Sequence, residues 1–221
     1  PGLIREIHSR GHEVASHGYG HELCINLDAE AIGEDLKKSR QILEDAIGER
    51  VWGYRAPSFS IDNGTMQVIA ACGYRYDSSY NSFKLHGRYG SVDLSSYAET
   101  GIAVKAADNF YELPVSNMTI GRHTILPWGG GAYLRLMPIG LFKLGIKHIL
   151  RRQGAYLFYL HPWEIDPGQP RIGEASFSAR LKHYKNLDQT SRKLRTLIRT
   201  FQNCRFVACR DYLEREVFCG G

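Results

Sequence analysis

Apolar positions along the chain change between helical spacing and short extended runs. Helical spacing with an N-cap before it and a glycine after it predicts helices over residues 28–47 and 62–72. The same spacing predicts helices over residues 136–152 and 187–202, and in residues 1–10 the end of a helix that starts upstream. Strand-forming runs predict strands at residues 13–16, 51–54, 74–76, 110–115, 155–160 and 206–209, and residues 81–109 predict a long loop or hairpin insert.

This order of elements favours an α/β fold, because strands that alternate with helices form a parallel sheet covered by helices. The run at residues 155–160 is apolar on both faces, which is typical of a strand buried between two layers. No GxGxxG turn follows a predicted strand, so a (β/α) barrel is preferred over a doubly wound nucleotide-binding sheet. No repeat, low-complexity tract or linker divides the chain, which predicts a single domain over residues 1–221.

Composition excludes several other classes of protein. The 221 residues are 43% hydrophobic, which is enough for a packed core, so a disordered chain is excluded. The most apolar region, residues 126–150, is interrupted by Arg135, Lys143 and Lys147, so no membrane span is expected. The net charge of +5 arises mainly near the C-terminus, where a solvated helix face is a commoner cause than nucleic-acid binding. Five cysteines without a CxxC pair, and no secretory signal, favour the reducing cytoplasm.

Reactive side chains directly follow four of the predicted strands: His17, Arg55, Asp77 and His161. In a parallel barrel the carboxyl ends of the strands share one rim, so we expect these side chains to converge there. His17 and His21 form a His-x3-His pair around Gly-Tyr-Gly, and two neutral imidazoles suit zinc or a similar metal. A catalytic zinc needs about three protein ligands. The third is either Asp77 or an Asp upstream of this chain.

The other candidates have a functional and a structural interpretation. Arg55 is a permanent cation that can orient a carboxylate or bind a developing oxyanion, or else pairs with a surface acid. His161 follows the most apolar strand, where restricted access of water suits a general acid, or else is a hydrogen-bonded core histidine. Tyr19 and Trp163 can stack on sugar rings, although aromatic residues are as often part of a core.

Four stretches together resemble the polysaccharide deacetylases with a NodB homology domain. They are GHEVASHGYGH at residues 11–21, RAPSFS at 55–60, YDSS at 76–79 and YLHPWEIDPGQP at 159–170. The string at residues 161–170, with His183-Tyr184 and Asn186-Leu187-Asp188 after it, is similar to the subgroup in bacterial exosortase (PEP-CTERM) exopolysaccharide loci. The resemblance implies a distorted (β/α) barrel that here lacks its first strand, because the family's Thr-Phe-Asp-Asp strand has no equivalent in this sequence.

The resemblance also implies a metal and a set of site residues. A divalent metal, usually zinc, is held in the family by Asp-His-His, and His17 and His21 match the two histidines. The Asp ligand is expected upstream of Pro1. Four other residues match roles in the family. Arg55 matches the arginine that positions the catalytic base, and the backbone N–H of Ser58 matches the oxyanion donor. His161 matches the general acid, and Asp77 approximately matches the acidic residue that tunes this histidine.

The implied function is the metal-dependent removal of N-acetyl groups from an N-acetylhexosamine-containing exopolysaccharide or oligosaccharide. Without the upstream Asp we expect this chain to bind metal weakly and turn over poorly. Two other functions stay open: a catalytically silent carbohydrate-binding or assembly subunit, and a metal-independent, allantoinase-like amidohydrolase. Zinc content and acetate release separate the three. The oligomeric state, the sugar and its linkage are left open.

Overall fold

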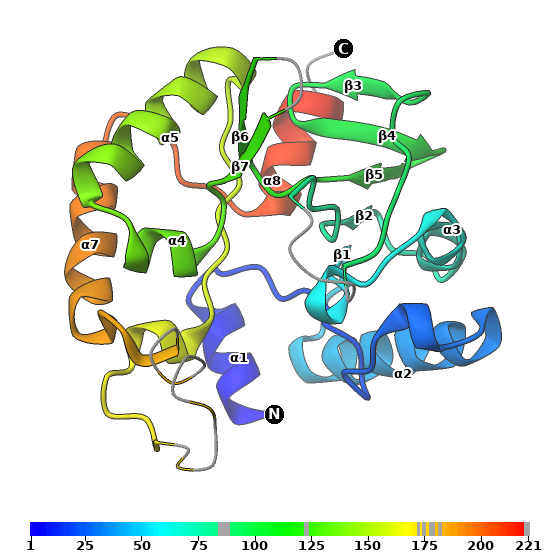
Figure 1. Ribbon diagram of the computed structural model, residues 1–221. Coiled ribbons are helices and arrows are strands. Elements are labelled where there is room, and N and C mark those ends of the chain that lie inside the picture. The colour runs from blue at the N-terminus through cyan, green and yellow to red at the C-terminus, as the bar shows by residue number, and fades with distance from the viewer. Residues whose placement is uncertain are drawn as a thin grey trace. The chain divides into compact units, whose positions relative to one another are not determined.

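The structure of the protein is a computed structural model (Figure 1). It describes residues 1–83, 89–121, 124–171, 173, 176, 180 and 183–218. The chain divides into two compact units, Pro1–Val115 with Val207–Gly221 and Ser116–Phe206, which are described separately below. The single domain expected over residues 1–221 stays a prediction. Among the described helices, none is long and apolar enough to cross a membrane.

Two of the described helices of the first unit, α2 (Ala29–Ile47) and α3 (Asn63–Ala71), begin where an aspartate cap predicts. The other α-helices described in this unit are α1 (Gly2–Ser9) and α8 (Cys209–Leu213), the last continuing into a π-helical turn, Glu214–Phe218. The Asp28 carboxylate accepts from the N–H of Ala31 at 2.9 Å, and so caps a backbone donor that has no partner within the helix. Gly48 ends α2 at φ +73°, a conformation that favours glycine. The predicted helices at residues 28–47 and 62–72 are confirmed.

The sheet of the first unit has the order β1-β2-β5-β4-β3 in the described part of the chain. Its strands are β1 (Gly53–Tyr54), β2 (Tyr76–Asp77), β3 (Ala98–Thr100), β4 (Ala103–Ala107) and β5 (Phe110–Glu112). The pairs β1–β2 and β2–β5 are parallel, whereas β3 and β4 form an antiparallel hairpin within the predicted insert. Ser16 forms a parallel bridge with Tyr54 beside β1. The α/β class with a parallel sheet is therefore confirmed.

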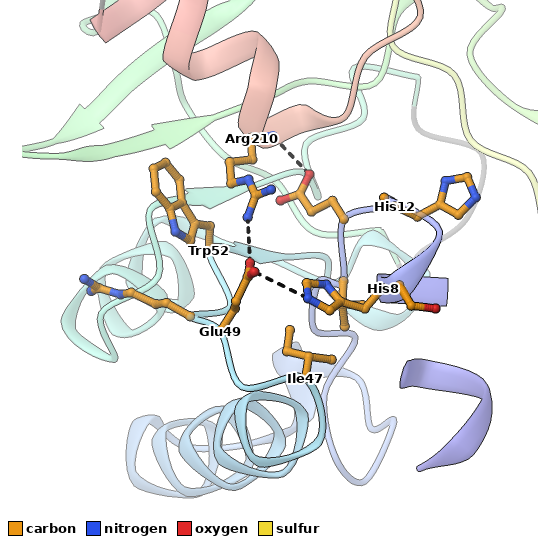
Figure 2. Close-up of a pocket in the computed structure, with 11 residues that line it drawn as sticks. His8, His12, Ile47, Glu49, Trp52 and Arg210 are labelled. Atoms are coloured by element: carbon orange, nitrogen blue, oxygen red, sulfur yellow. Dashed lines mark hydrogen bonds and ion pairs between the residues drawn. The ribbon is translucent and has the colours of Figure 1, made fainter. Parts of the chain in front are cut away.

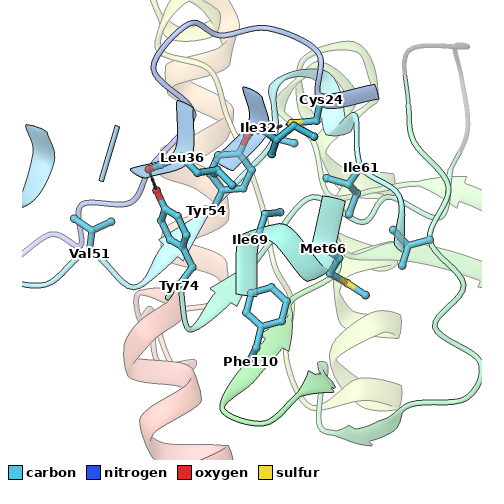
Figure 3. Packing of buried hydrophobic residues seen from close by; sticks show 12 residues of the cluster. Cys24, Ile32, Leu36, Val51, Tyr54, Ile61, Met66, Ile69, Tyr74 and Phe110 are labelled. Atoms are coloured by element: carbon cyan, nitrogen blue, oxygen red, sulfur yellow. Dashed lines mark hydrogen bonds between the residues drawn. The ribbon is translucent and has the colours of Figure 1, made fainter. Parts of the chain in front are cut away.

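The core of this unit fills the space between the sheet and the helices α2 and α3 (Figure 3). Leu36 from α2, Ile69 from α3 and Tyr54 from β1 are each at most 2% exposed. The Tyr74 hydroxyl donates to the carbonyl oxygen of Leu36 at 3.0 Å, so the buried phenol has a partner. This packing fixes where the parallel strands end, and so where the residues that follow them lie.

The described part of the second unit combines a hairpin with the helices α4 (Gly131–Leu136), α5 (Ile139–Gln153) and α7 (Leu187–Thr200). Strands β6 (Asn117–Ile120) and β7 (Thr124–Pro127) pair antiparallel, and they were not predicted. Instead of one helix over residues 136–152, the chain breaks at Met137, whose extended conformation is the one that a following proline, Pro138, favours. The Trp128 and Phe142 rings stack at 5.8 Å in the core.

Three predicted strands are wrong. Residues 13–16 form only the single bridge between Ser16 and Tyr54. Residues 155–160 are half-buried, and within them only Tyr159 forms a bridge, with Gly130. Their apolar sequence packs on one side, because the neighbouring backbone at Gly129 and Gly130 offers only a single point of pairing. Residues 206–209 form no strand: Phe206 is 65% exposed and Cys209 begins α8. High strand propensity is not sufficient where the fold provides no partner strand.

Candidate active site

The loop that carries the His-x3-His pair is held in shape by a carboxylate of α2. Asp35 accepts from the backbone N–H groups of Tyr19 at 2.9 Å and Gly20 at 2.7 Å. Gly18 lies at φ +81°, and a Cβ there would come within 3.0 Å of the Asp35 carboxylate, so the loop requires glycine. The rings of His17 and His21 consequently lie with their centroids 5.0 Å apart, at 74° to each other. The predicted pairing of the two imidazoles is present.

The orientation of His17 is defined by the end of the next strand. Its Nδ1 lies 2.5 Å from the carbonyl oxygen of Arg55, directly after β1. Because a carbonyl oxygen only accepts, Nδ1 carries the hydrogen, and the lone pair of the neutral ring is then on Nε2. This is the arrangement in which metal-binding histidines are usually held.

Arg55 links the ends of two parallel strands. Its Nε donates to the carbonyl oxygen of Ser78 at 2.6 Å, and its terminal nitrogen donates to the Ser78 hydroxyl at 2.6 Å. That hydroxyl donates in turn to the carbonyl oxygen of Leu113, just after β5, at 2.8 Å. Within the first unit, the polar residues at the carboxyl edge of the strands therefore lie together, as the strand order predicts.

Asp77 lies beneath this edge and is fully buried. Its two oxygens accept from the hydroxyl of Ser79 at 2.6 Å and from the N–H of Ser79 at 3.0 Å. In the β2–β5 register Asp77 is opposite Glu112, a second fully buried carboxyl whose Oε1 accepts from the N–H of Tyr80 at 2.9 Å. Burial raises the pKa of Asp77, and burial together with the neighbouring Asp77 charge raises the pKa of Glu112 well above its ordinary value. The two raised pKa values mean that the Asp77–Glu112 pair is more stable with a proton on at least one of its carboxyls.

Ser58 and Tyr19, the two predicted substrate contacts in this unit, are exposed. Ser58 lies at φ +52° and Phe59 at +58°, an unusual conformation for two successive non-glycine residues. Within the described part of the chain, the N–H of Ser58 makes no hydrogen bond. The Lys38 ammonium lies 3.7 Å from the centroid of the Tyr19 ring, and this cation–π contact occupies one face of the ring.

In the second unit, His161 and Trp163 belong to a 3-10 turn, Pro162–Ile165, and its N-cap. The side chain of His161 is 55% exposed, which differs from the expected restriction of water. Trp163 stacks between His161, at 5.6 Å, and His183, at 4.2 Å between ring centroids. The imidazoles thus already cover much of the indole that was expected to stack on sugar. The convergence of His161 with His17 and His21 concerns both units and stays a prediction.

Three carboxylates with structural roles were missed by sequence reasoning: Asp35, Glu112 and Glu164. The signals available were weak. Glu112 is a lone charge in an apolar strand, Glu164 stands three residues after an N-cap, and Asp35 has no local pattern that marks it. Among the described residues, no group of three or more His, Cys, Asp or Glu side chains is placed to hold a metal ion. Asp77 is thus not brought to the histidine pair as a third ligand.

A separate cavity of about 250 Å³ lies before the same strands, at their amino ends (Figure 2). Glu49 forms ion pairs with His8 Nε2 at 3.5 Å and with Arg210 at 3.6 Å across it. Glu13 accepts from the N–H of Arg210 at 3.0 Å, and burial raises the pKa of its carboxyl. The lining groups satisfy one another, and none of the predicted site residues lines this cavity.

Two family models match the chain. Residues 78–214 match the family described as a domain of unknown function (DUF3473), and residues 1–76 match the polysaccharide deacetylase family. The chain belongs to the DUF3473 family and carries a polysaccharide deacetylase sequence in its N-terminal third. The resemblance to the polysaccharide deacetylases is confirmed. Membership of the exosortase-associated subgroup stays a prediction.

Two curated relatives each match about a third of the chain. A peptidoglycan deacetylase-like protein, FGM2, of Gibberella zeae is 39% identical over 69 residues, 31% of this chain and 20% of that protein. A peptidoglycan deacetylase of Helicobacter pylori is 35% identical over 82 residues, 36% of this chain and 28% of that protein. The chain thus spans less than a third of either relative by alignment.

Solved structures show the fold. A putative polysaccharide deacetylase from Mycobacterium smegmatis aligns with a TM-score of 0.51 at 22% identity, over 94% of this chain and 70% of that one. Puue allantoinase aligns with a TM-score of 0.57 at 14% identity, over 97% of this chain and 63% of that one. At these identities the likeness concerns architecture alone. The predicted deacetylase-type α/β fold is confirmed.

Proposed function

We propose that this chain is part of a metal-dependent N-deacetylase that acts on an N-acetylhexosamine-containing exopolysaccharide. The observation that carries the proposal is the pair His17 and His21, with ring centroids 5.0 Å apart at the carboxyl edge of the parallel strands. The polysaccharide deacetylase match over residues 1–76 includes both histidines and Arg55. The substrate class and the metal are the parts of the proposal that go beyond the family.

The residues present fit a divalent metal, most plausibly zinc, as two of its ligands. The hydrogen bond from His17 Nδ1 to the Arg55 carbonyl leaves the lone pair on Nε2, which is the ring atom that then coordinates. His21 lies at φ +55°, a strained conformation that the loop maintains. A catalytic zinc takes about three protein ligands, and the family resemblance implies that the third is an Asp. When bound, such a metal acts as a Lewis acid that polarises the carbonyl of the scissile amide.

Two groups of the first unit support the developing oxyanion. Arg55 is a permanent cation that two hydrogen bonds to Ser78 hold in place. The exposed N–H of Ser58, in a turn where two residues have positive φ, provides a backbone donor of the kind that stabilises a tetrahedral intermediate. Neither group has to rearrange during the reaction, which is the basis of electrostatic preorganisation.

His161 supplies the proton that the reaction requires. Water adds to the acetyl carbon and passes one proton to the catalytic base that the family resemblance implies. The C–N bond then breaks, and the leaving amine takes a proton from His161 as acetate is released, after which the proton held by the base returns to His161. With Nδ1 facing Glu164, the proton that is transferred is the one on Nε2. In this proposal His161 acts together with His17 and His21 at one site.

The proposal is tested by zinc binding and acetate release in the same variants. His17→Ala and His21→Ala are expected to lower zinc affinity by roughly tenfold or more, whereas His12→Ala, an exposed histidine outside the loop, leaves it unchanged. His161→Asn is expected to retain zinc and lose release of acetate from N-acetylglucosamine oligosaccharides. Retained zinc affinity in both loop variants would contradict the metal assignment.

The other functions predict different results in the same assay. Retention of the oligosaccharide without release of acetate, with zinc bound, would identify a silent carbohydrate-binding subunit. Hydrolysis of a small amide by zinc-free protein would identify an allantoinase-like amidohydrolase. The second outcome is not expected if both histidines bind the metal, and the first is not expected if His161 acts as the general acid.

We also propose that the protein works in a reducing compartment, the bacterial cytoplasm. Among the described cysteines, Cys24, Cys72, Cys204 and Cys209 carry free thiols, which supports this. Cys219 lies outside the described residues. Fractionation of cells that produce the whole protein tests the location.

A further inference from the structure

Glu164 is a buried carboxylate in direct contact with His161. Its side chain is 1% exposed, although it lies in a short turn at the surface of the second unit. Its Oε1 lies 3.2 Å from the backbone nitrogen of His161 and 3.2 Å from His161 Nδ1. The bond from the His161 backbone N–H is one half of a capping box across Pro162 and Trp163, and this turn also brings the carboxylate back onto the imidazole.

This geometry decides which nitrogen of His161 carries the hydrogen in the neutral ring. A backbone N–H always donates, so Oε1 is an acceptor toward His161. A carboxylate oxygen only accepts, so the Nδ1 that lies 3.2 Å from it is the ring nitrogen that carries the hydrogen. Nε2 is left as the atom that gains and loses a proton during a reaction.

Glu164 is itself held by a buried arginine. Arg135 in α4 is 2% exposed, and its Nε lies 3.7 Å from Glu164 Oε2. The Arg135 guanidinium donates to the carbonyl oxygens of His183 at 2.6 Å and Lys185 at 2.9 Å, and these bonds fix its position. A buried ion pair of this kind is stabilising only when its geometry is well satisfied, and removing one partner is costly.

The neighbouring backbone is shaped to admit the carboxylate. A Cβ on Gly131, at the start of α4, would lie 2.6 Å from Glu164 Oε1 and would overlap the side chain of Leu160. Glycine is therefore needed at residue 131 for close approach, although its backbone conformation is an ordinary helical one. The same element thus provides both the space for Glu164 and its counter-ion.

We propose that Glu164, held by Arg135, is a positioning residue that fixes the tautomer and the orientation of the His161 ring, so that Nε2 faces the substrate. The inference rests on the proposed function for the role of His161, but the contact itself does not. The resemblance assigned the tuning acid to Asp77. In the structure Asp77 is bonded to Ser79 and paired with Glu112, and the carboxylate on His161 comes from its own turn.

The direct test is the tautomer of His161, measured by ¹⁵N NMR of the uniformly labelled full chain with His161→Asn used for assignment. In the wild-type protein, at a pH where the ring is neutral, the Nδ1–H form is expected. A wild-type ring in the Nε2–H form overturns the proposal without any variant. Glu164→Ala is expected to move the ring toward the Nε2–H form that solvated imidazoles favour.

Asp166→Ala is the matched control, because Asp166 is an exposed acid two residues away that bonds to the N–H of Gly168. It is expected to leave the tautomer unchanged. An unchanged tautomer in folded Glu164→Ala overturns the proposal. Glu164→Gln keeps an oxygen acceptor of the same size, so partial rescue of the Nδ1–H form is expected there.

Kinetics separate this inference from the proposed function. If acetate is released, Glu164→Ala should lower kcat by roughly 10- to 100-fold with little change in KM, since an orienting carboxylate is lost while substrate contacts remain. Equal loss in Asp166→Ala would overturn the specific role of Glu164. If the wild type shows the Nδ1–H tautomer but releases no acetate, the positioning holds and the proposed function fails.

Discussion

The buried carboxyl pair Asp77 and Glu112 makes a quantitative prediction for stability. Glu112→Gln replaces a carboxyl of the same size with a neutral amide that can still donate to Asp77. Burial and the Asp77 charge raise the pKa of Glu112 in the folded state well above the ordinary value of 4.5 that applies when the chain unfolds. The contribution of Glu112 to stability is therefore fully present below pH 4.5 and is lost as the pH rises toward the folded-state pKa.

The magnitude follows from the number of protons involved. One group that is protonated when folded and ionised when unfolded lowers the free energy of unfolding by about 1.4 kcal/mol for each pH unit. Between pH 5 and pH 7 the wild type should thus lose up to about 2.7 kcal/mol relative to Glu112→Gln. At pH 5 the two proteins should be nearly equal in stability, and at pH 7 the glutamine variant should be the more stable.

Urea denaturation of both proteins at several pH values measures this difference. The comparison between variants reports on the carboxyl pair, because titratable groups other than Asp77 contribute equally to both proteins. Glu99→Gln, on the exposed strand β3, is the control and should follow the wild-type profile. Parallel profiles for Glu112→Gln and the wild type would refute the reasoning, since Glu112 would then be ionised in the folded protein.

Three other substitutions test the structure more locally. Asp35→Ala removes the acceptor that holds the Tyr19 and Gly20 N–H groups, and should weaken zinc binding in calorimetry by roughly tenfold, whereas exposed Glu34→Ala should not. Gly53→Ala would place a Cβ into the ring of Tyr76 and should cost about 1–3 kcal/mol of stability; a neutral result would mean that the strands are further apart. Lys193→Met removes three hydrogen bonds to carbonyl oxygens at the end of α4. The free energy of unfolding, measured by urea denaturation, should fall by about 1–3 kcal/mol. No loss would show that water replaces the ammonium.

The sequence was informative wherever structure depends on nearby residues. Asp28 and Gly48 define the ends of α2 through hydrogen bonds and backbone conformations that span only a few positions. The placing of His17 and Arg55 at one edge followed from the order of parallel strands, and the structure joins them by a hydrogen bond. These features need only periodicity, capping and strand direction.

The strand predictions failed where pairing depends on distant partners. Residues 155–160 and 206–209 have the composition of strands, yet the first has one bridge and the second none. The hairpin of β6 and β7 was overlooked because each strand has only four residues, which is too short for a clear pattern. Strand composition expresses a tendency, and pairing decides whether the strand forms.

The sequence by itself determined the order of helices and strands, the histidine loop and the family, because these are encoded in local spacing and in contiguous motifs. Only the tertiary structure decided that Asp77 pairs with Glu112 and that Asp35 holds the loop. A buried carboxylate takes its role from the one neighbour that compensates its lost hydration. Which neighbour that is depends on strand register and on helix packing, and neither is visible in the sequence around the carboxylate.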